Sequence, residues 1–408
     1  MDIYVYSTGM ELLGVVDEIN SLMWTRRYWR CGEFSLLAPL NSRNSSLLRL
    51  GRLIMRKGDE EAGQIQYIRI SKDNSGMDTI EVQGKFVTHW LGARLILTSD
   101  TYSMATHTLL ETLVAENMVS PSTTARKIPS LSVRAGTVDD EILDYTTEIY
   151  SGLLDVCESR AQLAKIGFRI ITDQDEGKHY FTTYKGLDRT SSQSTNPPAI
   201  FSPDFDNVLS QEMTSSRENL ATDAYIEGQT NENAPRLIAE VSSGMYTGLD
   251  RIECYYLASD IAQTVSNADG TQKTIPDDKY IAMLAAKGAS YLQSKIETNS
   301  FASTINPNAL LKYKVDYDVG DRVTCINRQW GVTRDARITE ATETWDSSGP
   351  GLSITFGESL PTLSETLKWR QDNGRKEQLF QQRKRRPKIQ GRGLGQLLWR
   401  ADRQRRIP

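Results

Sequence analysis

The feature that most constrains the fold of this chain is a succession of short runs rich in β-branched and aromatic residues, separated by corners that contain glycine or proline. Runs of this kind fill the first hundred residues: Asp2–Ser7, Glu11–Val16, Leu22–Trp29, Glu33–Ala38, Leu53–Arg56, Gln64–Ser71 and Thr79–Val87. Four more follow late in the chain: Leu310–Tyr317, Arg322–Asn327, Ala336–Asp346 and Leu352–Phe356. Many short strands at this spacing are typical of small barrels and sandwiches.

Segments with helical periodicity interrupt these strands. Apolar residues recur about every three to four positions in Thr108–Asn117 and in Asp139–Gly167, where they include Ile142, Tyr145, Ile149 and Leu153, so we expect two helices. A longer helix is expected near 276–300, between Pro276 and Ser300. The pattern predicts a mainly β chain with α/β insertions (α+β). It divides the chain into a β-rich block at 1–100, an inserted α/β domain at 101–204, a second β-rich module at 205–360 and a tail at 361–408.

The stretch LLKYKVDYDVGDRVTCIN, from Leu310 to Asn327, allows two interpretations. Asp316, Asp318 and Asp321 resemble the ligands of a calcium loop. An EF-hand loop that begins at Asp316 needs Gly at its sixth position and Glu at its twelfth, but the chain has Asp321 and Asn327 there. The alternation of Leu311, Tyr313, Val315 and Tyr317 with polar residues instead favours a strand, a turn at Gly320 and Asp321, and a second strand.

The residues that usually carry catalysis or bind metal are sparse. The four cysteines, Cys31, Cys157, Cys254 and Cys325, form no CxxC pair and are expected to be buried free thiols. The three histidines, His89, His107 and His179, belong to no HExxH motif, and the sequence has no GxSxG, GxxxxGK[ST] or GxGxxG motif. We therefore predict no catalytic residue, metal site or cofactor, and hence no enzyme.

Charge is distributed unevenly along the chain. Residues 366–408 contain fourteen Lys or Arg and three Asp or Glu, a net charge of +11 that leaves −15 for the preceding 365 residues, because the whole chain carries −4. We expect this tail to dock on an acidic partner protein, through a set that includes Arg383, Lys384, Arg385, Arg386 and Trp399. Binding of DNA by the same basic segment is the alternative. No run of eighteen apolar residues predicts a transmembrane helix, and the N-terminus does not resemble a secretory signal, so we expect no stable membrane insertion.

Several segments together resemble the tail hub family of long, non-contractile phage tails, also called baseplate hub or tail-associated proteins. They are WTRRYWRCGEFSLLAP (Trp24–Pro39), the segment Gly51–Ile96, YKGLDRTSSQ (Tyr184–Gln193), IFSPDFDNVLSQEM (Ile200–Met213), and DYDVGDRVTC, RITEATETWD and LSITFGE within Asp316–Glu358. The resemblance covers about residues 1–360. It implies two tube-type β-barrel modules with inserted α/β material and assembly as a homotrimer.

The resemblance also implies a function and a set of partners. The chain would be a structural virion protein of the tail tip, made in the host cytoplasm. It would join the distal tail protein and the tape-measure protein to receptor-binding or fibre proteins, and would close the channel until DNA is ejected, with transient DNA contact in the channel. The alternatives are a cell-wall hydrolase acting during host entry and a DNA-contacting protein that uses the basic tail.

The residues expected to matter are architectural. Gly320 and Asp321 are expected to set the turn of the last β-rich module. Four large aromatic side chains, Trp24, Trp29, Phe34 and Trp90, are expected to anchor the core of the first module.

Overall fold

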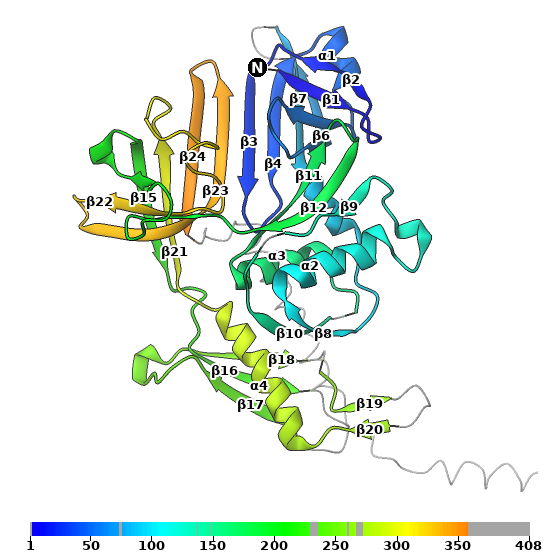
Figure 1. Cartoon of the computed structure of the whole chain (residues 1–408), viewed down its shortest axis with the longest axis vertical. Helices are drawn as coiled ribbons and strands as arrows, with labels where there is room; N and C mark the ends of the chain where they lie inside the picture. Colours follow the sequence, from blue (N-terminus) through cyan, green and yellow to red (C-terminus); the bar gives the residue numbers. More distant parts are fainter. Residues whose placement is uncertain are drawn as a thin grey trace, which may run out of the picture. The chain divides into compact units, whose positions relative to one another are not determined.

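A large sheet combines strands from both ends of the sequence in the computed structural model of the chain (Figure 1), which describes residues 2–72, 76–136, 138–147, 149–228, 236–258, 261–266 and 272–357. Its main path runs in the order β15 (Val208–Ser216), β21 (Thr298–Ile305), β24 (Gly349–Gly357), β23 (Val332–Asp346), β3 (Ser21–Arg27), β4 (Glu33–Pro39), β7 (Asp78–Phe86), β6 (Gly63–Lys72), β5 (Leu53–Arg56), β1 (Ile3–Tyr6) and β2 (Leu12–Val16). The fold is therefore mainly β, as predicted.

The first block forms its strands where the sequence places alternating apolar residues. In β4 the side chains of Phe34, Leu36 and Ala38 are buried, while those between them are partly exposed. They join a core made by β1 to β7 and by the short helix α1 (Ser42–Leu47), whose first turn is capped by the side chain of Asn41.

The two β-rich blocks join through β3 and β23. These strands pair antiparallel from Glu340 opposite Arg27 to Trp345 opposite Leu22. Among the described residues the path of strands keeps two open ends, so the pairings close neither block into the barrel that the sequence predicts. The two blocks share one sheet instead.

The described residues of the inserted segment include the α-helices α2 and α3 and two small sheets. Helix α2 (Thr106–Val114) packs against α3 (Leu153–Ala164) and β12 (Lys178–Tyr184). The predicted helix at 139–167 is wrong in its first half: Ile142 and Tyr145 belong to β10 (Ile142–Thr146), which pairs with β8 (Thr101–Ala105). Helix α3 begins only after Gly152 and ends at Ala164, followed by Lys165 in the left-handed conformation. Strand β11 (Gly167–Asp173) pairs with β12, and β12 with β9 (Leu131–Val133).

Residues 219–297 include a smaller unit with its own apolar core. Helix α4 (Asp277–Gln293) covers one face of a sheet made by β17 (Ile238–Ser242), β16 (Asp223–Gly228) and β18 (Glu253–Ala258). Strands β19 (Thr264–Ser266) and β20 (Gln272–Thr274) pair antiparallel in a separate two-stranded sheet. Helix α4 ends at Gln293 rather than near Ser300, because Thr298 already starts β21, which pairs with β24. No helix within the described ranges is long and apolar enough to cross a membrane.

The predicted strand Leu310–Tyr317 is also wrong. This segment forms a compact turn in which Lys314 adopts a left-handed φ of 67° and the Asp316 carboxylate accepts a hydrogen bond from the Lys312 amide at 2.7 Å. The expected second strand is β22 (Arg322–Asn327), which pairs with β23 and with the short β13 (Asp188–Arg189) and β14 (Ile200–Phe201). We call residues 310–318 the charged turn, because its side chains enter the ion-pair network described below.

Candidate functional site

Two of the sequence motifs meet at the Gly320–Asp321 turn. One Asp321 carboxylate oxygen accepts a hydrogen bond from the Leu187 amide at 2.7 Å, and the other accepts one from Arg189 Nε at 2.9 Å. The Arg322 amide donates to the Leu187 carbonyl at 2.9 Å. The Gly320 amide donates to the Ile338 carbonyl of β23, and the Ile338 amide donates to the Asp321 carbonyl, both at 2.8 Å. The turn thereby connects YKGLDRT, β22 and β23. We call this contact the glycine junction.

Glycine is required at this junction for two reasons. Gly320 has a φ of +100°, and a Cβ atom there would lie 2.6 Å from the ring of Tyr28. Gly186 is packed as closely, because its Cβ would lie 2.0 Å from the backbone of Gly320. A side chain at Gly320 would collide with the buried ring of Tyr28, and one at Gly186 would collide with the backbone of Gly320.

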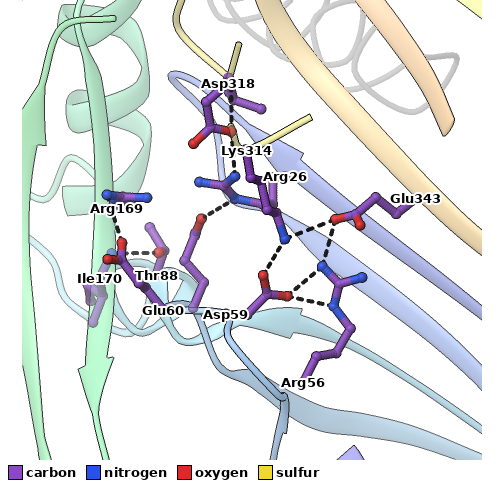
Figure 2. A network of polar contacts seen from close by, with 12 residues as sticks. Arg26, Arg56, Asp59, Glu60, Thr88, Arg169, Ile170, Lys314, Asp318 and Glu343 are labelled. Carbon is purple, nitrogen blue, oxygen red and sulfur yellow. Dashed lines mark hydrogen bonds and ion pairs between the residues drawn. The ribbon is translucent and has the colours of Figure 1, made fainter. Parts of the chain in front are cut away.

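Beside the junction, the charged turn is held by Arg26 of β3 (Figure 2). Arg26 donates to Glu61 at 3.0 Å, to Asp318 at 2.7 Å and to the Tyr313 hydroxyl at 3.1 Å, and the side chains of Arg26 and Glu61 are both less than a tenth exposed. Burial lowers the pKa of Arg26, but the groups that it contacts raise it further, so the guanidinium stays charged with a pKa well above its usual range.

A second group of charges lies next to the first (Figure 2). Arg56 of β5 contacts Asp59 at 2.5 Å and Glu343 of β23 at 2.6 Å. Lys314 of the charged turn contacts Asp59 and also reaches Glu343 at 3.1 Å. The Arg56 guanidinium carbon lies 5.1 Å from the ring centre of Trp24 and 4.7 Å from that of Trp345. We call these two groups together the ion-pair network.

The network joins parts of the chain that are far apart in sequence. It connects β3, β5 and the loop at 59–61 to the charged turn and β23. Glu60 of the same loop makes a separate ion pair with Arg169 of β11 at 2.9 Å (Figure 2). Buried ion pairs contribute little net stability over apolar packing, but removing one partner leaves an unpaired buried charge. The network therefore favours the arrangement of these segments in which each buried charge keeps its partner.

The four predicted aromatic anchors divide between two cores. Trp24 and Phe34 lie in the core of the first block, with ring centres 5.7 Å apart. Trp29 lies instead in the larger core, 5.5 Å from Tyr28. Trp90 is partly buried against that core and donates a hydrogen bond to Gln64 at 2.9 Å.

The three aspartates that resemble calcium ligands in the sequence have other partners. Asp316 caps the charged turn, Asp318 pairs with Arg26, and Asp321 holds the glycine junction. Within the described ranges no three His, Cys, Asp or Glu side chains gather in a way that could hold a metal ion. The basic docking residues Arg383, Lys384, Arg385, Arg386 and Trp399 lie outside the described residues.

The histidines and cysteines lie mostly in packed surroundings. His179 is buried, with its ring nearly perpendicular to that of Trp90, and shares a hydrogen bond of 3.0 Å with Thr172. Burial lowers the pKa of His179 to about 4. The ring of His107 contacts Asp140, which also accepts a hydrogen bond from the first turn of α2. Cys31, Cys157 and Cys325 are buried and Cys254 is partly buried, and burial raises the pKa of each thiol.

Sequence reasoning did not find Arg26, Arg56, Asp59, Glu61, Lys314 or Glu343 as site residues. One signal was available in WTRRYW. Arg26 lies two residues from both Trp24 and Tyr28, so in a strand its side chain is on the same, inward face as theirs. An arginine at an inward position needs a buried acidic partner. The sequence does not reveal which carboxylates supply it.

The chain matches the family described as Siphovirus ReqiPepy6 Gp37-like protein over residues 2–358. No curated protein matches it. Its fold is similar to that of the tail protein from Neisseria meningitidis MC58, with 12% identity, a TM-score of 0.53, and coverage of 88% of this chain and 96% of that one.

Two prophage proteins also have a similar fold. They are the 43 kDa tail protein of prophage MuSo2 from Shewanella oneidensis (14% identity, TM-score 0.50, 87% of this chain and 97% of that one) and the tail protein gp18 from Listeria monocytogenes EGD-e (10%, 0.50, 90% and 99%). At these identities the likeness shows a shared fold. The resemblance to tail proteins of long-tailed phages is thus confirmed at the level of family and fold, and the chain belongs to the Siphovirus ReqiPepy6 Gp37-like family.

Proposed function

We propose that this protein is a structural component of the phage virion at the tip of the tail. Three copies would form a hub that joins the tail tube and the distal tail protein to the receptor-binding apparatus. The hub would contact the tape-measure protein and close the channel until DNA is ejected. Membership of a siphovirus family and a fold shared with prophage tail proteins support this proposal.

The observation that carries the proposal furthest is the pairing of β3 with β23. It makes strands of 1–100 and 205–360 parts of one sheet, so each copy offers a wall built from two β-rich modules. Three such copies would present six modules, which suits a three-fold tip attached to a six-fold tube. We keep the division into modules at 1–100 and 205–360, an insertion at 101–204 and a tail at 361–408 as part of this proposal, with tube-type barrel curvature in each module.

The mechanism proposed is mechanical and involves no covalent chemistry. The glycine junction and the ion-pair network fix the charged turn against both modules. A hub of this kind would act by holding its modules in one arrangement and by rearranging them when the receptor-binding apparatus engages. The side chains of this site have structural partners, which supports a role in assembly.

The tail at 361–408 is proposed to dock on an acidic partner protein through its basic residues. Truncation after Pro361 would then reduce incorporation of the chain into tails. If the tail contacts DNA instead, the full-length chain would bind DNA with a steep dependence on salt, and truncation would abolish that binding.

Electron microscopy of intact particles tests the hub proposal. We expect class averages of the tail tip to contain three copies of this chain in a ring below the six-fold tube, with two β-rich modules per copy. Absence of the chain from the tip, or its presence as an isolated globule that lines no channel, would contradict the proposal. A turnover assay on purified peptidoglycan then tests the hydrolase alternative.

A further inference from the structure

Strand β6 leaves most of one edge without a partner strand. Its beginning is covered, because Gln64 lies opposite Leu53 of β5 and Ile65 bonds to the backbone of residues 51 and 52. From Gln66 to Lys72, β6 pairs within the described residues only with β7. This edge exposes apolar side chains, since Tyr67 is 48% and Ile70 is 59% exposed.

Strand β15 has a comparable edge at the other side of the sheet. It pairs along its length with β21, and no second described strand pairs with it. Leu209 is 65% and Met213 is 37% exposed on this strand. A long edge with exposed apolar side chains invites pairing with another chain, and soluble proteins usually block such edges.

The strand directions let the two edges meet. From β15 to β6 the path contains eight strands, β15-β21-β24-β23-β3-β4-β7-β6, and each successive pair is antiparallel. Because eight is even, β15 and β6 run in opposite directions within this alternation. A second copy placed so that its β15 follows β6 would continue the antiparallel order across the boundary.

Charge is complementary as well. Strand β6 carries Arg69, which pairs with Glu81, and Lys72, which lies 4.0 Å from Asp78, while β15 carries the exposed Glu212. Cross-strand pairs of opposite charge and of apolar side chains both stabilise the pairing of two strands.

We propose that β6 residues 66–72 of one copy pair with β15 residues 209–214 of the next copy, so that the sheet continues from chain to chain. Because two different edges meet, the contact is head-to-tail, and a closed ring requires that the rotation between neighbours return to the first copy. The inference rests on the trimeric hub proposed above and names the surfaces that join its copies.

Disulfide cross-linking in assembled tails tests the contact. Ile70→Cys on β6 is combined in one chain with Leu209→Cys, Gln211→Cys or Met213→Cys on β15, so that the three combinations sample the register. We expect at least one combination to give, on mild oxidation, linked species of two and three copies that reduction reverses. Each single variant controls for the native cysteines. Leu209→Cys with Ile142→Cys is the matched control, because Ile142 is exposed on β10, outside both edges.

The outcomes separate this inference from the hub proposal. If electron microscopy places three copies in a ring but no combination cross-links, the β6–β15 contact is wrong while the hub proposal stands. If Ile70→Cys alone links two copies, β6 meets β6, and the head-to-tail contact is overturned. If the tip contains no ring of this chain, both proposals fail.

Discussion

The segment 310–321 is held at two places by different means: the ion-pair network holds the charged turn at 310–318, and the glycine junction holds Gly320 and Asp321. At the junction, Gly320 fits because of its shape and backbone conformation, and Asp321 bonds mostly to backbone amides and to Arg189. In the network, the charged turn is held by side-chain charges at Arg26, Asp59 and Glu343. The junction should therefore tolerate no side chain at Gly320, while the network should tolerate change only where charge stays balanced.

The largest effect is expected from Gly320→Val. A β-branched residue with φ near +100° is strained, and its Cβ would overlap the Tyr28 ring, so we expect the free energy of unfolding to fall by about 4 kcal/mol or more in urea titrations. Gly349→Val is the matched control, because Gly349 has a φ of +106° with no atom near its Cβ and should lose only about 1–3 kcal/mol. Equal losses in the two variants would show that close packing on Tyr28 adds nothing.

The next effect tests the network. Asp59→Asn leaves Arg56 and Lys314 with Glu343 alone, and Asp59 and Arg56 are both about 95% buried at the side chain. We expect a loss of about 3 kcal/mol in the free energy of unfolding. Asp17→Asn, which removes an exposed pair with Arg43 at 3.4 Å, should change it by less than about 0.5 kcal/mol. If Asp59→Asn lowers the free energy of unfolding no more than Asp17→Asn does, the network does not fix the charged turn.

Acid is expected to lower the stability of the fold through His179, which belongs neither to the glycine junction nor to the ion-pair network. Burial lowers its pKa from 6.5 to about 4, so protonation favours the unfolded chain. The stability due to neutral His179 is fully present above pH 6.5 and is lost as pH falls from 6.5 through 4, by at most about 3 kcal/mol. Stability measured over this range should fall less steeply in His179→Gln. Parallel pH profiles for the two proteins would assign the acid sensitivity elsewhere.

The smallest effect concerns an uncharged contact between the same strands. Thr25 of β3 and Thr342 of β23 share a hydrogen bond of 3.0 Å, and Thr25 is 2% exposed. Thr342→Val leaves a buried hydroxyl without its partner and should lower the free energy of unfolding by about 1 kcal/mol. The double variant Thr25→Val/Thr342→Val should recover most of that loss. A double variant worse than the single one would point to packing rather than hydrogen bonding.

Local patterns predicted the strands of the first block and the position of the turn at Gly320 and Asp321. They failed where a partner strand decides the structure. Leu311, Tyr313, Val315 and Tyr317 alternate like a strand, yet β21, β24 and β23 pair with one another and the segment turns instead. Apolar alternation in a sequence indicates which side chains of a strand would face the core. It does not indicate whether another strand has an unpaired edge with which that segment can pair.

The helix expected at 139–167 failed for a related reason. Ile142 and Tyr145 have helical spacing, but Thr101–Ala105 provides a strand with which they pair. The ion-pair network was beyond reach, because Lys314 and Asp59 are 255 residues apart and no local pattern connects them. In the predicted helix at 139–167 and in the predicted strand Leu310–Tyr317, strand pairing elsewhere in the fold therefore overrode the local pattern.

The pairing of β3 with β23 also has a consequence for synthesis. Thr25 and Thr342 meet although they are 317 residues apart, so the ribosome must release nearly the whole described chain before the central sheet can form. Contacts of such long range slow folding, and they leave the edge of β3 that pairs with β23 open in the meantime. A nascent chain of this protein would depend on protection from aggregation until its last strands emerge.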